Sequence, residues 1–224
     1  MKIAFIITSV INTINLNLTY GVRSFYSHEQ RFQQTKETIQ SIRINVPTAD
    51  IYFIEGSTVN RNIENFFLNV NNLIYINVGH NENITEGIKS RLKGYGESLQ
   101  IKHILENYNL KQYDFIFKIS GRYKLNGGFN LNKLIKSDKV IFCREKNKVS
   151  TVLFGFPSFL INTLTNLYTY IAKIYSQYQA KLILGEKIQL HYERVIPYIL
   201  KDYNVVNSIG VEGMVSSYHV KYSC

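Results

Sequence analysis

The stretch YDFIFKISGRY, residues 113–123, combines a buried strand with a polar, cationic end. Its first part is an almost unbroken apolar run, which is typical of a central strand covered on both faces of a sheet. The chain then changes within three residues to Ser120, Gly121 and Arg122. Open α/β sheets bind ligands at the carboxyl ends of their strands, so we expect the working centre of the chain here. An ordinary strand followed by a glycine turn is the alternative interpretation.

The first 80 residues alternate between strand and helix patterns. Strands are predicted at residues 2–10 (KIAFIITSV), 50–54 (DIYFI) and 73–78 (LIYINV), with helices at 32–46 and 60–70 between them. Parallel neighbours need a crossover of about a dozen residues, and right-handed crossovers bring the strand ends to one edge of the sheet. The ends that would face one crevice are Thr8–Ser9, Glu55–Ser57 and Gly79–His80. The sequence therefore predicts an α/β fold with a mostly parallel central sheet flanked by helices.

The second half of the chain has a different pattern. It predicts a helix at 98–106, a small antiparallel hairpin of strands at 139–143 and 151–156, a long helix at 159–178, a helix at 186–202 and a strand-like, irregular tail from 205. Pro197 is expected to kink or break the fourth of these elements. No internal repeat or domain boundary emerges, so we predict one domain, residues 1–224.

The charge of the chain favours an anionic partner. Its net charge is +10 and its pI is near 9.4, which suits a phosphorylated small molecule, a nucleic acid or an anionic membrane surface. Lys and Arg are dispersed, with no run of five like charges, which argues against a nucleic-acid-binding arm or a polybasic anchor. We expect no nucleic-acid partner and leave a peripheral membrane contact open.

The cysteines and the apolar segments bear on the compartment. Cys143 lies in an apolar run and Cys224 is the last residue, which does not suggest a disulfide framework, so two reduced thiols are expected. The N-terminal apolar run is too short for a membrane span and lacks a cleavage-type site. These features predict a cytoplasmic protein, with attachment to the membrane surface left open. The five His and two Cys show no metal-ligand spacing, so no structural zinc is expected.

Residues at the end of the opening strand could bind a diphosphate. Lys118 and Ser120 point to the same face, because side chains alternate along a strand. Arg122 follows Gly121 and offers a bidentate fork to phosphate oxygens. Cations that are simply solvated are the alternative.

Two further groups could carry chemistry. Lys93, Gly94 and Gly96 precede a predicted helix, where free backbone N–H groups favour phosphate, although a plain loop is at least as consistent. Glu186, near His191, Glu193 and Arg194, could act as a general base toward an acceptor hydroxyl, with a solvated helix face as the alternative. Arg23, in the polar loop after the first strand, is a further candidate for ligand binding.

Three passages resemble the GT-A-type, nucleotide-sugar-dependent glycosyltransferases, most closely the small WavE-like and large-DNA-virus types. The passages are KIAFIITS, RFQQTKETIQSIRINVPTADIYFIEGS and KGYGESLQIKHILENYNLKQYDFIFKISGRY, which lie in the first half of the chain. The resemblance implies transfer of a sugar from a nucleotide-diphosphate sugar to a glycan, lipid-linked or protein acceptor. By the same implication Thr8 and Ser9 line the base and ribose, and Glu55 accepts a hydrogen bond from one of them. Residues 1–123 would be the nucleotide-binding half and 124–224 the acceptor-side half.

The chain departs from this family at one motif. Where the family carries Asp-x-Asp, which holds a divalent metal on the donor diphosphate, this chain has Ser120-Gly121-Arg122. We therefore predict no metal site and leave manganese or magnesium dependence open. Arg122, with Lys118 or Lys93, is expected to neutralise the leaving diphosphate instead, and Glu186 would be the acceptor-side base if the enzyme inverts. A non-catalytic nucleotide- or nucleic-acid-binding module and a degenerate transferase scaffold are the alternatives.

Overall fold

A seven-stranded sheet runs through the protein, in a computed structural model that describes residues 1–13, 24–90, 92, 94–145, 148–183, 192–215 and 220–224. The strand order is β3-β2-β1-β4-β7-β6-β8. The strands are β1 Ile3–Ser9, β2 Asp50–Glu55, β3 Leu73–Asn77, β4 Phe115–Ser120, β6 Val140–Glu145, β7 Lys148–Pro157 and β8 Tyr203–Val206. Strands β3, β2, β1 and β4 are parallel, β7 is antiparallel to both of its neighbours, and β8 is parallel to β6. The predicted α/β fold with a mostly parallel sheet and an antiparallel hairpin is confirmed.

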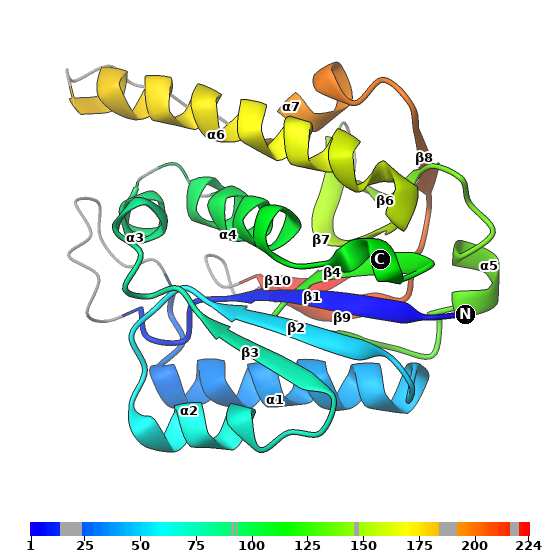
Figure 1. The fold of residues 1–224 in the computed structure, drawn as a ribbon, viewed down its shortest axis with the longest axis horizontal. Coiled ribbons are helices and arrows are strands. Elements are labelled where there is room, and N and C mark those ends of the chain that lie inside the picture. The colour runs from blue at the N-terminus through cyan, green and yellow to red at the C-terminus, as the bar shows by residue number, and fades with distance from the viewer. Residues whose placement is uncertain (14–23, 91, 93, 146–147, 184–191, 216–219) are drawn as a thin grey trace.

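Helices cover both faces of the sheet (Figure 1). On one face lie α1 His28–Asn45 and α2 Arg61–Leu68, and on the other lie α3 Glu82–Lys89, α4 Tyr95–Asn107 and α6 Ile161–Ile183. The short helix α5 Leu131–Leu134 precedes β6, and α7 Tyr192–Ile199 contacts β7 and α6. The helix expected at 98–106 is thus the longer α4, and α3 in front of it was not predicted.

The core has two parts because the central strands contribute side chains to both faces. In β1, Ala4 and Ile6 pack toward α3, α4 and α6, whereas Phe5 and Ile7 pack toward α1 and α2. All seven residues of β1 and all six of β4 are buried. This double coverage explains why both strands appear in the sequence as nearly continuous apolar runs.

A second, three-stranded sheet was not predicted. It pairs β5 Tyr123–Leu125 with β9 Val211–Val215, and β9 with β10 Val220–Ser223, all antiparallel. The tail, expected to be strand-like and irregular, therefore contains β9, β10 and the end of β8. Because β5 begins at the residue after Arg122, this small sheet continues directly from the polar end of β4.

Helix α1 holds this small sheet in place through buried hydroxyl groups. Thr35 Oγ1 donates to Gly121 O at 3.1 Å, and Thr38 Oγ1 donates to Tyr123 O at 2.8 Å. Leu125 N donates to Ser41 Oγ at 3.0 Å. These partners explain how a helix with polar residues on its inner face packs against the protein.

The structure corrects two expectations about the C-terminal part. Cys143 and Cys224, predicted to be separate thiols, form a disulfide with their Cα atoms 6.4 Å apart. Pairing was not visible in the sequence because the two residues are 81 positions apart and meet only through β6 and the C-terminal end of β10. Helix α7 continues past Pro197 to Ile199, so the proline does not break it. The first part of the helix predicted at 186–202 lies outside the described residues.

Among the residues that the structure describes, no helix is both long and apolar enough to cross a membrane.

Candidate functional site

The carboxyl ends of the parallel strands meet at one edge of the sheet, as predicted. Ser9 lies opposite Glu55, and Thr8 lies opposite Ser120 in the strand register. Backbone hydrogen bonds continue the contact beyond the strands, from Gly56 N to Ser9 O at 2.9 Å and from Gly121 N to Thr8 O at 2.9 Å. The polar residues at the ends of β1, β2 and β4 are therefore joined by backbone hydrogen bonds along this edge.

A buried ion pair lies at the centre of this edge. The ammonium of Lys118, which is 0% exposed, pairs with Oε1 of Glu97 from the first turn of α4. The same ammonium donates to Ser120 Oγ at 2.9 Å and to Thr151 O of β7 at 2.8 Å. These three acceptors use all three of its hydrogens, so Lys118 has none left for a diphosphate.

Glu97 lies at the centre of this edge and is a candidate site residue that sequence reasoning missed. Its Oε1 also accepts hydrogen bonds from Thr8 Oγ1 and Ser120 Oγ, both at 2.9 Å. One carboxylate oxygen thus connects the ends of β1 and β4. A signal was present, because a single Lys within the apolar strand FIFKIS requires a buried acidic partner. Only the fold identifies that partner.

The electrostatics of the pair reflect its burial. Loss of hydration lowers the pKa of Lys118, and the Glu97 carboxylate opposes that effect. The positive charge of Arg122 lowers the same pKa, whereas the negative charge of Glu193 on α7 raises it. Helix α7, which carries Glu193, contacts β7, the strand whose Thr151 O accepts from the Lys118 ammonium.

Arg122 is half-buried at the end of β4. Its guanidinium carbon lies 5.7 Å from the centre of the Tyr123 ring, a distance at which a cation is attracted to the face of an aromatic ring. The backbone is tightly turned here, with Arg122 N donating to Ser120 O at 2.7 Å. The predicted cation is therefore at the strand end, with Tyr123 beneath it.

Two of the predicted glycines lie where the chain packs closely. A Cβ on Gly96 would lie 2.8 Å from Ile88 Cα and 2.9 Å from Ile88 N, so the backbones of α3 and α4 approach too closely for a side chain. A Cβ on Gly121 would lie 3.2 to 3.3 Å from Ser9, Ile7 and Thr35. Gly94 is the N-cap residue of α4. Gly96 thus brings the start of α4 against α3, and Gly121 lies close to β1 and α1 at the end of β4.

Glu55 is enclosed rather than open to a ligand. Its side chain is 0% exposed, and its Oε1 accepts from Ile11 N at 2.9 Å and from both N and Oγ of Ser57. Among the described residues, its Oε2 has no hydrogen-bond partner. Burial raises the pKa of Glu55, and hydrogen bonds from Ser57 and Ile11 oppose the rise. Glu55 therefore fixes the loops that follow β1 and β2.

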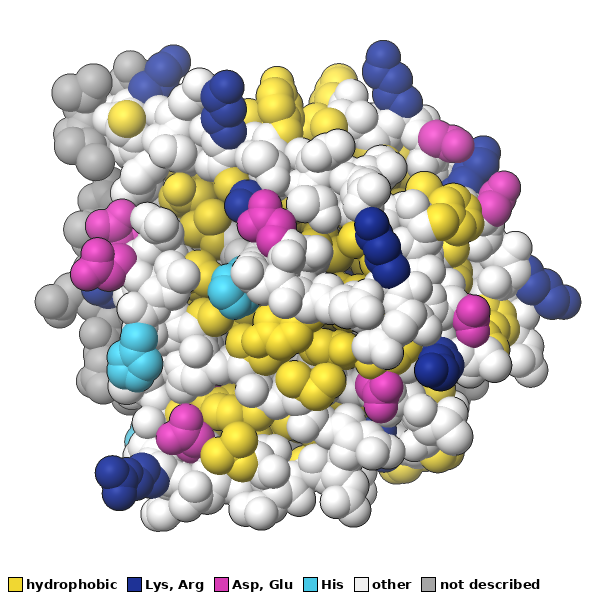
Figure 2. Space-filling model, in the orientation of Figure 1, with side chains coloured by type: hydrophobic (Ala, Val, Ile, Leu, Met, Phe, Trp, Pro, Cys, Tyr) yellow, Lys and Arg dark blue, Asp and Glu magenta, His cyan; other side chains and the backbone are white. Residues whose placement is uncertain are grey.

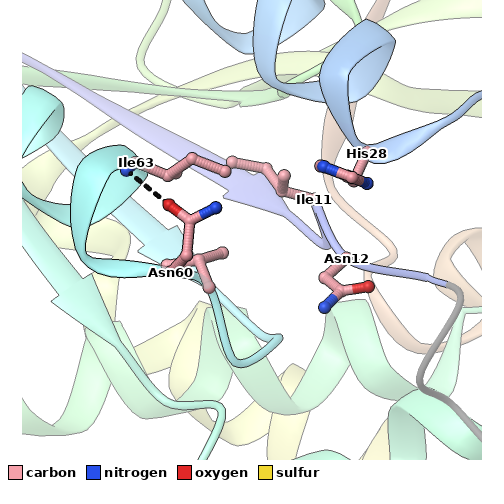
Figure 3. A pocket seen from close by; sticks show the side chains of 6 residues that line it. Ile11, Asn12, His28, Asn60 and Ile63 are labelled. Carbon is pink, nitrogen blue, oxygen red and sulfur yellow. Dashed lines mark hydrogen bonds between the residues drawn. The ribbon is translucent and has the colours of Figure 1, made fainter.

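A small pocket of about 180 Å³ opens beside these loops (Figure 3). It is lined by Ile11, Asn12, His28, Val59, Asn60 and Ile63. Asn12 is fixed by hydrogen bonds from its backbone N to Ser57 Oγ at 2.9 Å and from its side chain to Thr58 O at 3.2 Å. Figure 3 shows His28 at the start of α1 facing Asn60 and Ile63 of α2 across the opening. The pocket therefore lies between two helix starts at the strand-end edge of the sheet.

Three predicted site residues, Arg23, Lys93 and Glu186, lie outside the described residues. The other predicted residues lie at the strand-end edge or at the start of α4. Thr8, Ser9 and Ser120 are buried there, and Ser9 O accepts from Gln100 Nε2 at 2.8 Å.

The residues at the strand ends do not fit a divalent metal ion. Among the described residues, no group of three or more His, Cys, Asp or Glu side chains is placed to hold one. The carboxylate that reaches the end of β4 is Glu97, and Lys118 already neutralises it. Asp114, the nearest acid upstream, binds Lys2 N at 2.6 Å at the opposite end of the strand.

Positive charge is dispersed over the surface in Figure 2. Lys and Arg side chains lie at separate points on this face, with Asp and Glu side chains among them, and hydrophobic side chains form a band across its middle. Lys and Arg are therefore dispersed over the face shown, as they are along the sequence.

Solved structures of glycosyltransferases share this fold. The apo form of GlyE from Streptococcus pneumoniae TIGR4 aligns with a TM-score of 0.55 and 8% identity, and a second GlyE structure aligns with 0.57 and 9%. Each alignment covers 92% of this chain and 45% of GlyE. The apo structure of the bifunctional glycosyltransferase WbbM aligns with 0.53 and 9%, over 92% of this chain and 38% of WbbM. This chain therefore spans less than half the length of these proteins, and at such identities the likeness concerns the fold.

No protein-family model matches the sequence, and no curated protein sequence is detectably similar to it.

Proposed function

We propose that the protein is a GT-A-type glycosyltransferase that takes a sugar from a nucleotide-diphosphate donor. The observation that carries this proposal is the network of Thr8, Glu97, Lys118 and Ser120 at the carboxyl ends of β1 and β4. Ligands of open α/β sheets bind at this edge, and buried charged groups in such a position are candidates for function. The shared fold with glycosyltransferases indicates which function to test.

The pocket between α1 and α2 is the proposed binding site for the nucleobase. Its volume of about 180 Å³ is below the roughly 300–1,000 Å³ of sites for drug-sized ligands, so it suits one ring system of a larger ligand. Apolar side chains of Ile11, Val59 and Ile63 can pack on the faces of the ring, and Asn12 and Asn60 carry amide groups at the opening. Glu55 takes part indirectly, by holding the loop of Ile11.

Arg122 is the proposed countercharge for the donor diphosphate. A guanidinium binds phosphate oxygens with two parallel hydrogen bonds and stays charged at all relevant pH values. Because the neighbouring residues do not suit a metal ion, Arg122 would stabilise the charge that develops on the leaving group. Lys93, from the segment before α4, is a second candidate for this role.

The proposed reaction is a direct displacement if the enzyme inverts. The acceptor hydroxyl oxygen forms a bond to the anomeric carbon while the bond from that carbon to the diphosphate oxygen breaks. The hydroxyl proton passes to a carboxylate, and the nucleoside diphosphate leaves with the bonding electrons. Glu186 remains the proposed base, and the acceptor is a glycan, a lipid-linked sugar or a protein.

Thermal unfolding in the presence of nucleotide sugars tests the proposal. A ligand that binds the native state at 100 times its Kd adds about 2.7 kcal/mol of stability, which corresponds to about 5 to 10 °C in Tm for a chain of this size. We expect such a rise with one class of nucleotide sugar and its nucleoside diphosphate. The rise should be the same with EDTA as with manganese. Release of the nucleoside diphosphate in the presence of acceptor glycans then measures transfer.

Arg122→Ala should abolish most of the Tm rise, and Arg144→Ala, which removes an exposed Arg on β6, should leave it intact. Loss of activity in EDTA would contradict the metal-independent role of Arg122. A wild-type protein that binds no nucleotide sugar, but binds nucleic acid with a steep salt dependence, would show that the function is nucleic-acid binding instead. Nucleotide-sugar binding without transfer or hydrolysis would identify a degenerate scaffold.

A further inference from the structure

Glu97 and Lys118 differ in what they can offer a ligand. Lys118 is 0% exposed and donates its three hydrogens within the protein. Glu97 keeps 24% of its side chain exposed at the same edge of the sheet. A ligand at the strand ends can therefore reach part of the Glu97 side chain, whereas the Lys118 ammonium is buried.

Stability alone does not explain a buried pair of this kind. Removing an ammonium from water is costly, and apolar residues of similar volume often replace a buried ion pair without loss of stability. The ammonium has a local effect on Glu97. Together with Thr8 and Ser120 it fixes Oε1 of Glu97, and it compensates the negative charge of the carboxylate. We infer that Lys118 is a positioning residue and that the group it positions is the Glu97 carboxylate.

The compensated charge determines which ligand suits Glu97. A carboxylate that already has a cation gains less from a second cation, so a metal ion or an ammonium is a poor ligand. Part of the Glu97 side chain is exposed, and hydrogen bonds to an ionised acceptor are stronger than neutral ones. A neutral ligand with hydroxyl groups fits this chemistry.

We propose that Glu97 accepts a hydrogen bond from a hydroxyl group of the donor sugar, and so determines which sugar is bound. The inference rests on the proposed function. The position agrees with it, because Glu97 accepts a hydrogen bond from Thr8 at the end of β1, which leads to the proposed base pocket. Glu97 also pairs with Lys118 of β4, the strand that ends two residues before Arg122. The sugar would thus lie beside the diphosphate.

The test compares the affinity for a nucleotide sugar with the affinity for its nucleoside diphosphate, measured by calorimetry in the full chain. The variant Glu97→Leu/Lys118→Met removes the pair together, so that no uncompensated charge is left in the core. We expect its affinity for the nucleoside diphosphate to stay within about twofold of the wild type. The extra affinity contributed by the sugar should fall about 10- to 100-fold, which is the usual loss for a hydrogen bond to a charged group.

Lys118→Met tests the positioning role. It keeps the carboxylate but removes the group that fixes it, so the sugar-dependent affinity should fall less than in the double variant while nucleoside diphosphate binding persists. Lys102→Met/Glu106→Gln is the matched control, because it removes an exposed pair on the same helix. We expect the control to bind both ligands as the wild type does.

Each other outcome decides the question. If the double variant binds both ligands with the wild-type ratio of affinities, Glu97 does not contact the sugar and the inference is overturned. If both affinities fall by the same factor, the pair is only structural and the inference is again overturned. A wild-type protein that binds the nucleoside diphosphate, with no gain from any sugar, overturns the inference and leaves the nucleotide site standing. A wild-type protein that binds neither ligand contradicts the proposed function itself.

Discussion

The Glu97 carboxylate and the Lys118 ammonium form an ion pair that joins the first turn of α4 to the end of β4. The two residues are 21 positions apart, and Lys118 is fully buried while Glu97 is partly exposed. Because the two positions differ in burial, removing one member of the pair should not have the same effect as removing the other.

Glu97→Gln should destabilise the protein more than Lys118→Met does. The first change leaves an ammonium buried without its counter-ion, which typically costs about 3–5 kcal/mol. The second leaves a carboxylate that is partly hydrated and still accepts from Thr8 and Ser120. The double variant Glu97→Leu/Lys118→Met should lose less than Glu97→Gln. Urea denaturation of the three variants measures these differences.

The exposed pair Lys102–Glu106 on the same helix is the control for these measurements. Surface pairs contribute about 0–1 kcal/mol, so Glu106→Gln should change the free energy of unfolding by no more than that. Equal losses in all four variants would mean that the burial of Lys118 has no energetic consequence.

Gly96→Ala should lower the free energy of unfolding by about 1–3 kcal/mol, the usual cost of overpacking a close contact. The added methyl group would lie within 2.9 Å of the Ile88 backbone, so α3 and α4 must separate. Gly127→Ala is the matched control, since a Cβ there meets nothing within 4 Å. Urea denaturation compares the two variants. Similar free energies of unfolding for Gly96→Ala and Gly127→Ala would show that α3 and α4 can pack together without a glycine at position 96.

The order of the first elements could be predicted because each one has a local signal. Strands β1 and β4 are apolar runs of the right length, and α1 has a helical period ended by Pro47. Parallel pairing then follows from the length of the crossovers. The edge that would carry the site could be predicted from the same rules, before any side-chain contact was known.

The remaining features depend on contacts between distant residues. Tyr123 pairs with Gly213 in the small sheet, and Cys143 meets Cys224, with 81 positions between the cysteines. No local pattern specifies such partners. Glu97 was missed for the same reason, since its role arises only where α4 crosses the end of β4. Glu55 and Lys118 were predicted to be site residues, but the groups that enclose them could not be read from strand periodicity.

Reduction of the disulfide Cys143–Cys224 should lower the free energy of unfolding by about 2–4 kcal/mol, because the cross-link restricts the unfolded chain. The bond also fixes the C-terminal residue, whose backbone pairs with Val211 in the small sheet. Urea denaturation with and without a reducing agent measures the loss. Cys224→Ser is the control, because it cannot form the disulfide, and its free energy of unfolding should be the same with and without the reducing agent. Equal stability of the wild type in both conditions would contradict the prediction.

Glu55 should make the protein less stable as the pH rises from acid to neutral, relative to Glu55→Gln. Burial raises the pKa of this carboxyl in the folded protein above 4.5, its ordinary value in the unfolded chain. The folded state therefore binds the proton more tightly. The stabilisation that comes from the protonated Glu55 is complete below pH 4.5 and is lost as the pH rises through the pKa of Glu55 in the folded protein. Between those two values the difference in free energy of unfolding, wild type minus Glu55→Gln, should fall by up to about 1.4 kcal/mol per pH unit. Urea denaturation at a series of pH values measures it, and parallel profiles for the two proteins would show that burial does not raise the pKa of Glu55.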